Sequence, residues 1–121
     1  MKKILLKSAI PDVVINFSSV TFADRNSVLT SGGYLEDMVI AGFNGAIPLF
    51  KDTSYMLPLS KMVSVEARHS AYFRDLYNYN SFSDGSAVDG NGLDRVATPL
   101  AILENAKMYI QTRFDSSKLP G

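Results

Sequence analysis

Glu66 and His69 form a Glu-x-x-His pair in the stretch VEARHSAYFRDL, and His69 is the single histidine of the chain. A spacing of three residues places two side chains on one face of a helix, where they can reach a common point. A carboxylate and an imidazole that converge in this way can share a hydrogen bond or coordinate a metal ion. The pair therefore predicts one of three arrangements: a structural hydrogen-bond cluster, side chains that reach water at a helix edge, or part of a metal site.

Helical periodicity places this pair on an apolar stripe. Counted as heptads, the core positions of the segment are Leu59, Met62, Glu66, His69, Phe73 and Leu76. The same count in the preceding segment gives Leu29, Gly32, Glu36, Val39, Phe43, Ala46 and Phe50. An unpaired buried carboxylate costs several kcal/mol. We therefore expect Glu36, Glu66 and His69 to be hydrogen-bonded to one another or bound to a cation.

Two long helices are expected to carry these residues. The first is predicted over residues 21–50, with Thr21 or Asp24 as its N-cap, and the second over residues 55–79. Their apolar stripes predict that the two helices pack side by side.

The remaining segments predict connections and one further helix. Residues 80–97 are dense in Ser, Asp, Asn and Gly, which is typical of a loop. Thr98 followed by Pro99 predicts the start of a third helix over residues 98–114. Residues 1–20 predict the end of a helix and then an extended, β-branched connection. The sequence thus predicts an all-α fold, in one domain spanning residues 1–121.

Composition excludes several classes of function. The 121 residues carry twelve basic and twelve acidic side chains, so the chain lacks the excess of positive charge that a nucleic-acid partner requires. No stretch approaches the roughly 18 apolar residues of a membrane span, and we expect no membrane partner. The absence of cysteine excludes disulfides, zinc–thiolate sites and thiol nucleophiles. None of these properties indicates the compartment.

Other polar residues are predicted to have structural roles. Arg68 and Arg74 lie off the stripe of Glu66, so we expect them to face solvent or a carboxylate such as Asp37. The acidic stretch DGSAVDGNGLD lacks the ligand spacing of a calcium-binding loop and predicts a polar, turn-rich connection.

Two motifs resemble the ferritin-like domain of the desiccation-related protein family. They are YLEDMVIAGFNGAIPLFKD, which resembles the family's helix with Glu-Asp before small residues, and LPLSKMVSVEARHSAYFRDL, which resembles its Val-Glu-Ala-Arg-His helix. The resemblance extends over residues 3–119. It implies a partial ferritin-like four-helix bundle, in which a long helical hairpin is followed by a trailing C-terminal helix and preceded by an extended crossover segment. It also implies iron or manganese ligands at Glu36, Glu66 and His69.

Members of that family begin with a further helical hairpin that supplies the other metal ligands. In this chain KKILLKSAIP resembles only the end of that hairpin's second helix, so the resemblance implies half of a two-metal site. One reading is a metal-binding protein of the di-iron or di-manganese type, related to stress or desiccation. Its site would be completed by a homo-oligomer, such as a dimer, or by a second helical hairpin from another chain. The alternative is a non-catalytic structural or stress protein, or a truncated copy, with a vestigial metal site. No enzyme activity is assigned in either reading.

Overall fold

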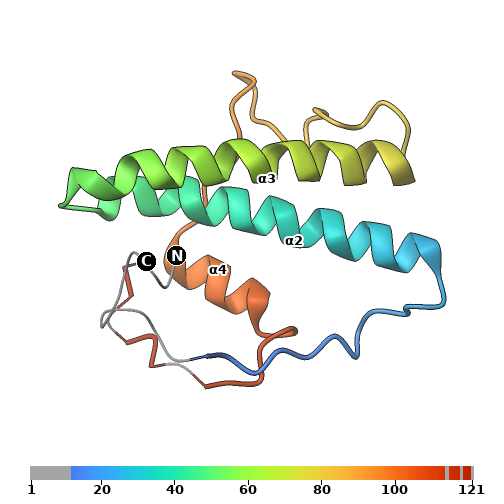
Figure 1. Cartoon of the computed structure of the whole chain (residues 1–121), viewed down its shortest axis with the longest axis horizontal. Helices are drawn as coiled ribbons and strands as arrows, with labels where there is room; N and C mark the ends of the chain where they lie inside the picture. Colours follow the sequence, from blue (N-terminus) through green and yellow to red (C-terminus); the bar gives the residue numbers. More distant parts are fainter. Residues whose placement is uncertain (1–11, 114, 118, 121) are drawn as a thin grey trace.

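The computed structural model describes residues 12–113, 115–117 and 119–120. The elements in chain order are helix α2 (Arg25–Ala46), the short 3-10 helices η2 (Ile47–Leu49) and η3 (Thr53–Tyr55), helix α3 (Met56–Tyr77) and helix α4 (Pro99–Ala106). Helices α2 and α3 lie side by side as a long hairpin, and α4 packs on the other side of α2 (Figure 1). The prediction of an all-α fold built on a long helical hairpin is confirmed.

Helix α2 begins where a carboxylate can cap it. The Asp24 side chain accepts a hydrogen bond from the backbone N–H of Asn26 at 3.0 Å, so Asp24 rather than Thr21 is the N-cap. This bond satisfies one of the backbone donors that a helix start leaves without a partner. The helix therefore starts later than the predicted residue 21.

The turn between the two long helices is built from short 3-10 segments. Pro48 lies in η2, where the α-helix has already given way to a tighter turn. Asp52 then caps η3 by accepting a hydrogen bond from the backbone N–H of Ser54 at 2.9 Å. Consequently α2 and α3 are each 22 residues long and end within the predicted ranges 21–50 and 55–79.

Helix α4 starts as predicted but is shorter than predicted. The Thr98 side chain accepts a hydrogen bond from the backbone N–H of Ala101 at 3.2 Å, and Pro99 occupies the first helical position. The helix ends at Ala106, so the prediction of a helix over residues 98–114 is wrong for residues 107–113, and residue 114 lies outside the described residues.

Pairing with the N-terminal segment explains this early end. The backbone N–H of Gln111 donates to the carbonyl of Val14 at 2.9 Å, and that of Asn16 donates to the carbonyl of Tyr109 at 2.8 Å. A continuing helix would need the same backbone groups for its own hydrogen bonds. Residues 12–20 contain no helix, which agrees with the predicted extended connection, whereas the helix end predicted before them lies outside the described residues.

Small apolar clusters hold these layers together. Leu29, Ile40 and Leu59 are buried in the hairpin, and Ala106 and Tyr109 are buried where α4 ends. Within the described part of the chain, every helix is too short or too polar to cross a membrane. The hairpin of α2 and α3 carries the residues singled out by the sequence, Glu36, Glu66 and His69.

Candidate metal centre

The structure brings Glu36, Glu66 and His69 together midway along the hairpin. The Nδ1 atom of His69 is hydrogen-bonded to Oε2 of Glu66 at 3.0 Å, and it lies 3.6 Å from Oε1 of Glu36. One ligand atom from each of the three residues falls within 4.8 Å of the others. Among the described residues this is the group of carboxylates and imidazoles that can hold a metal ion.

Close packing of α2 against α3 makes this convergence possible. Gly32 lies one turn before Glu36, and a Cβ atom at this position would come within 2.8 Å of the Phe73 ring. Gly33 allows a similar approach of Tyr77, at 3.3 Å from the same hypothetical atom. The absence of side chains at both glycines therefore lets the helices approach closely beside the three polar residues.

The three side chains differ in exposure. Glu36 and Glu66 are 22% and 24% exposed, whereas the side chain of His69 is 52% exposed. The prediction that His69 lies on the buried stripe is therefore wrong. The residues of α3 that are buried are Leu59, Ser70 and Arg74, because α2 and the segment after α3 cover that side of the helix.

Clustering changes the acidity of Glu36. Partial burial raises the pKa of Glu36 above its ordinary value, and a hydrogen bond and like charge from Glu66 raise it further. The positive charge that His69 can carry acts in the opposite direction, and Asp37 adds a smaller increase. A hydrogen bond between two carboxyl groups requires a proton on one of them. Folding therefore favours the protonated form of the Glu36 carboxyl group over its charged form.

We expect Glu36→Gln to stabilise the metal-free protein at pH 7 by about 0.5–1 kcal/mol, the scale of partly exposed charge pairs. The folded chain binds the Glu36 proton more tightly than the unfolded chain does, because the pKa is raised on folding. The free energy of unfolding therefore falls as pH rises from 4.5 through the raised pKa. Glutamine has no proton to lose, so the Glu36→Gln variant does not undergo this decrease in the free energy of unfolding. Urea denaturation in the presence of a chelator measures the difference.

The stabilisation by Glu36→Gln should be smaller at pH 4, where Glu36 is mostly protonated in both the folded and the unfolded chain. Glu104→Gln is the matched control, because this glutamate is paired with Lys107 at the surface, outside the cluster. A Glu36→Gln gain that is the same at both pH values would contradict the assignment.

A second polar cluster joins α3 to α2 around the buried guanidinium group of Arg74. Arg74 is only 5% exposed and forms an ion pair with Asp37 through Nη2, while its Nε donates to the same carboxylate at 3.3 Å. Ser70 donates a further hydrogen bond to Asp37. Burial lowers the pKa of Arg74, but the hydrogen bond and charge of Asp37 outweigh it, so the net pKa is raised and the guanidinium stays charged.

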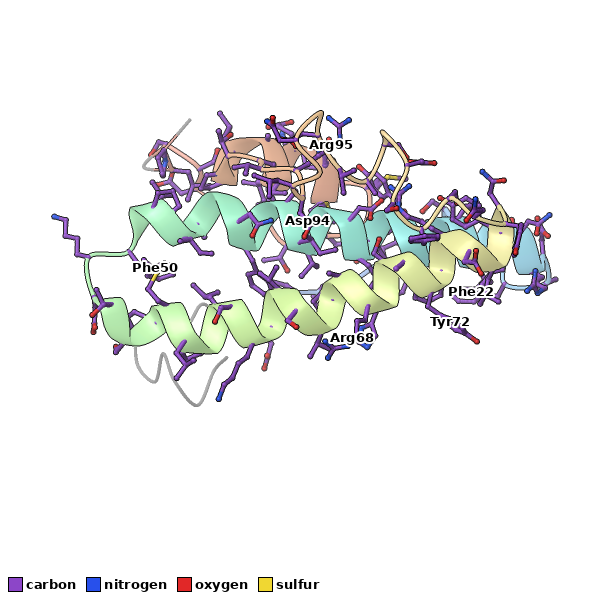
Figure 2. All side chains as sticks on the ribbon, turned by 90° about the horizontal axis from the view of Figure 1, so that it is seen from above. Phe22, Phe50, Arg68, Tyr72, Asp94 and Arg95 are labelled. Carbon is purple, nitrogen blue, oxygen red and sulfur yellow. The ribbon has the colours of Figure 1, made fainter. Side chains whose placement is uncertain are left out.

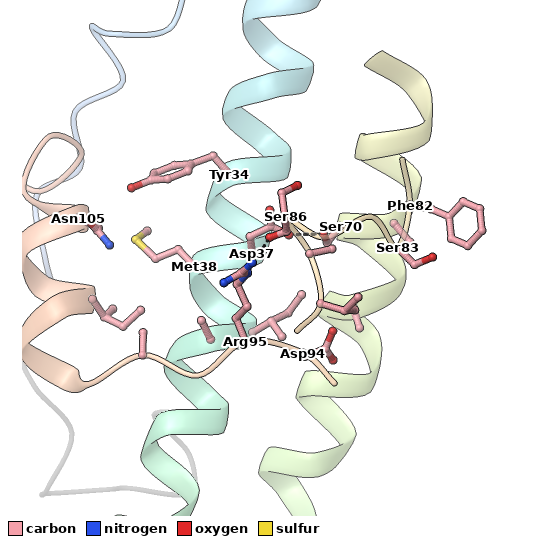
Figure 3. A pocket seen from close by; sticks show the side chains of 18 residues that line it. Tyr34, Asp37, Met38, Ser70, Phe82, Ser83, Ser86, Asp94, Arg95 and Asn105 are labelled. Carbon is pink, nitrogen blue, oxygen red and sulfur yellow. Dashed lines mark hydrogen bonds between the residues drawn. The ribbon is translucent and has the colours of Figure 1, made fainter. Parts of the chain in front are cut away.

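Arg74 also ties the segment after α3 to the hairpin. Its Nη1 donates to Ser86 Oγ at 2.7 Å and to Asp84 Oδ1 at 3.4 Å. Figure 3 shows Asp37, Ser70 and Ser86 together at the wall of a pocket between the hairpin and this segment. Because Arg74 neutralises Asp37, the cluster is a structural clamp and not a free acidic site.

The sequence identified one part of this clamp. Pairing of an off-stripe arginine with Asp37 was among the predictions and holds for Arg74, whereas Arg68 is exposed and bonds Ser64. Ser70 and Ser86 were not foreseen. No local signal marks them, because their partners lie on other elements of the fold.

A hairpin of two long helices with a Glu/Glu/His group between them defines the class of helical-bundle proteins with a carboxylate–histidine group. A model of the ferritin-like domain family matches residues 1–79, and the chain belongs to this family. No curated protein and no solved structure matches the chain.

Proposed function

We propose that this chain binds iron or manganese through Glu36, Glu66 and His69. The observation that carries the proposal is the convergence of three ligand atoms from two adjacent helices within 4.8 Å. Carboxylate oxygens suit hard divalent cations, and imidazole suits iron and its neighbours in the first transition row. Glutamate from one helix with Glu-x-x-His from the next is the donor set of the carboxylate-bridged metal bundles.

In this proposal Glu36 and Glu66 would supply carboxylate oxygens to the cation, and His69 would supply a ring nitrogen. Three protein ligands leave coordination positions for groups outside this chain. A bound, reduced iron or manganese ion would supply redox chemistry with dioxygen. A role in stress or desiccation belongs to the same proposal, and it is supported by the VEARH motif that carries His69.

One observation favours a second candidate, a structural helical protein with a vestigial site. The hydrogen bond of 3.0 Å between His69 and Glu66 pairs these two side chains without a cation. The two candidates differ in one measurable property. A vestigial cluster takes up no metal at stoichiometric levels, whereas a metal centre does.

Isothermal titration calorimetry, in which Mn²⁺ is added to the metal-free protein, separates these candidates by the amount of metal bound. We expect binding at one equivalent, and we expect His69→Ala to weaken it by at least about tenfold, because the variant removes a direct ligand. Glu66→Ala should do the same.

The matched control is Glu104→Ala, a surface glutamate outside the group, which should bind as the native chain does. Circular dichroism shows whether each variant is folded. Sub-stoichiometric metal in the folded native chain would establish the structural candidate instead.

A further inference from the structure

Helix α3 carries a largely apolar seam whose central residues are exposed, while Met62 and Leu76 near its two ends are partly buried. Met62, Val65, His69, Tyr72 and Leu76 follow one another at alternating spacings of three and four residues, the pattern by which a helix packs against another helix. We call these five residues the outer seam. Val65 is 38% and Tyr72 66% exposed, and His69 lies at the centre of the seam.

The rest of the described chain lies elsewhere on the hairpin. The segment after α3 is held against α2 by a hydrogen bond of 3.0 Å from the backbone N–H of Ala97 to the carbonyl of Ala41. Figure 2 shows Arg68 and Tyr72 along the outer edge of α3, whereas Arg95 of that segment lies beyond α2, on the other side of the hairpin. The outer seam and the metal ligands therefore share one open face.

The position of the ligands makes this face suited to a twofold contact. Glu36 is the twelfth of the 22 residues of α2, and Glu66 is the eleventh of the 22 residues of α3. A twofold axis that is perpendicular to a helix and passes beside its midpoint places the helix of a second copy antiparallel along its whole length. A second hairpin related by an axis near the ligands would thus cover the full outer seam, with self-complementary contacts.

We propose that a second copy of this chain packs on the outer seam, so that both copies supply Glu36, Glu66 and His69 to one shared site. This inference rests on the metal binding proposed above. The shared site would contain four carboxylates and two imidazoles. Four carboxylates repel one another unless cations are present, and two divalent ions match their charge. Metal binding and dimer formation are therefore coupled.

Sedimentation of the full chain, metal-free and with Mn²⁺, tests this coupling. We expect a monomer of 13.3 kDa without metal and a twofold increase in mass with one equivalent of Mn²⁺. His69→Ala should remain monomeric in both conditions. A dimer that persists in the presence of a chelator, or in His69→Ala, would overturn the proposal.

Two seam variants locate the contact. Tyr72→Arg and Val65→Arg change exposed side chains that are not ligands, and each should prevent the increase in mass. Tyr79→Arg is the matched control, because Tyr79 is 88% exposed and lies after α3, off the seam. A seam variant that still doubles its mass would place the contact elsewhere. If the native chain binds metal but remains monomeric, the dimer is overturned and the metal site is supported. If the native chain binds no metal, both proposals are overturned.

Discussion

Arg74→Met is expected to lower the free energy of unfolding by about 3 kcal/mol, the scale on which breaking a buried ion pair acts. Arg74 is 5% exposed, and its guanidinium holds Asp37 from α2 and Ser86 from the following segment. Methionine fills a similar volume but has no donors, so the Asp37 carboxylate loses its cation in a half-buried site. Urea denaturation at pH 7 measures the loss.

Arg68→Met is the matched control on the same helix. Arg68 is exposed and donates only to Ser64, so its replacement should change the free energy of unfolding by no more than about 0.5 kcal/mol. Adding Asp37→Asn to Arg74→Met should recover part of the loss, because it removes the carboxylate left without a cation. Equal effects of the two arginine variants would show that Arg74 does not act as a clamp.

Gly45→Ala is expected to destabilise the fold by about 2 kcal/mol, the scale of overpacking in a tight contact. Alanine would ordinarily stabilise a helix interior relative to glycine by up to about 1 kcal/mol. At this position, however, a Cβ atom would collide with the backbone carbonyl of Ala97, whose carbon it would approach to 2.9 Å. The segment cannot retreat freely, because the N–H of Ala97 is bonded to the carbonyl of Ala41. Thermal or urea unfolding measures the effect.

Gly85→Ala provides the control for this substitution. No atom lies within 4 Å of a Cβ built at Gly85, so the change should stay within about 0.5 kcal/mol. A Gly45→Ala variant as stable as the native chain would mean that the contact with Ala97 does not form. The comparison isolates the cost of that contact from the general effect of replacing a glycine.

Much of the fold could be predicted because its signals are local. The apolar stripes of α2 and α3 and the start of α4 at Thr98 depend on residues within a few turns of one another. The end of α4 could not be predicted in this way. It depends on hydrogen bonds between Val14 and Gln111, which lie at opposite ends of the chain.

The candidate site shows the same division. Glu66 and His69 are three residues apart on one helix, so their convergence follows from helix geometry alone. Glu36 joins them only because α2 packs closely against α3 at Gly32. The heptad count placed all three on stripes that face the core, which is wrong for His69, because its side chain is 52% exposed.

The sequence by itself determined the two long helices, the cap at Thr98 and the helical spacing of Glu66 and His69, because these properties depend on neighbouring residues. Only the tertiary structure decided which side of α3 is buried. Arg74 and Ser70 are enclosed by α2 and the segment after α3, whereas His69 is left at the outer seam. Burial depends on which distant segments cover a helix face, and no spacing within the helix encodes that coverage.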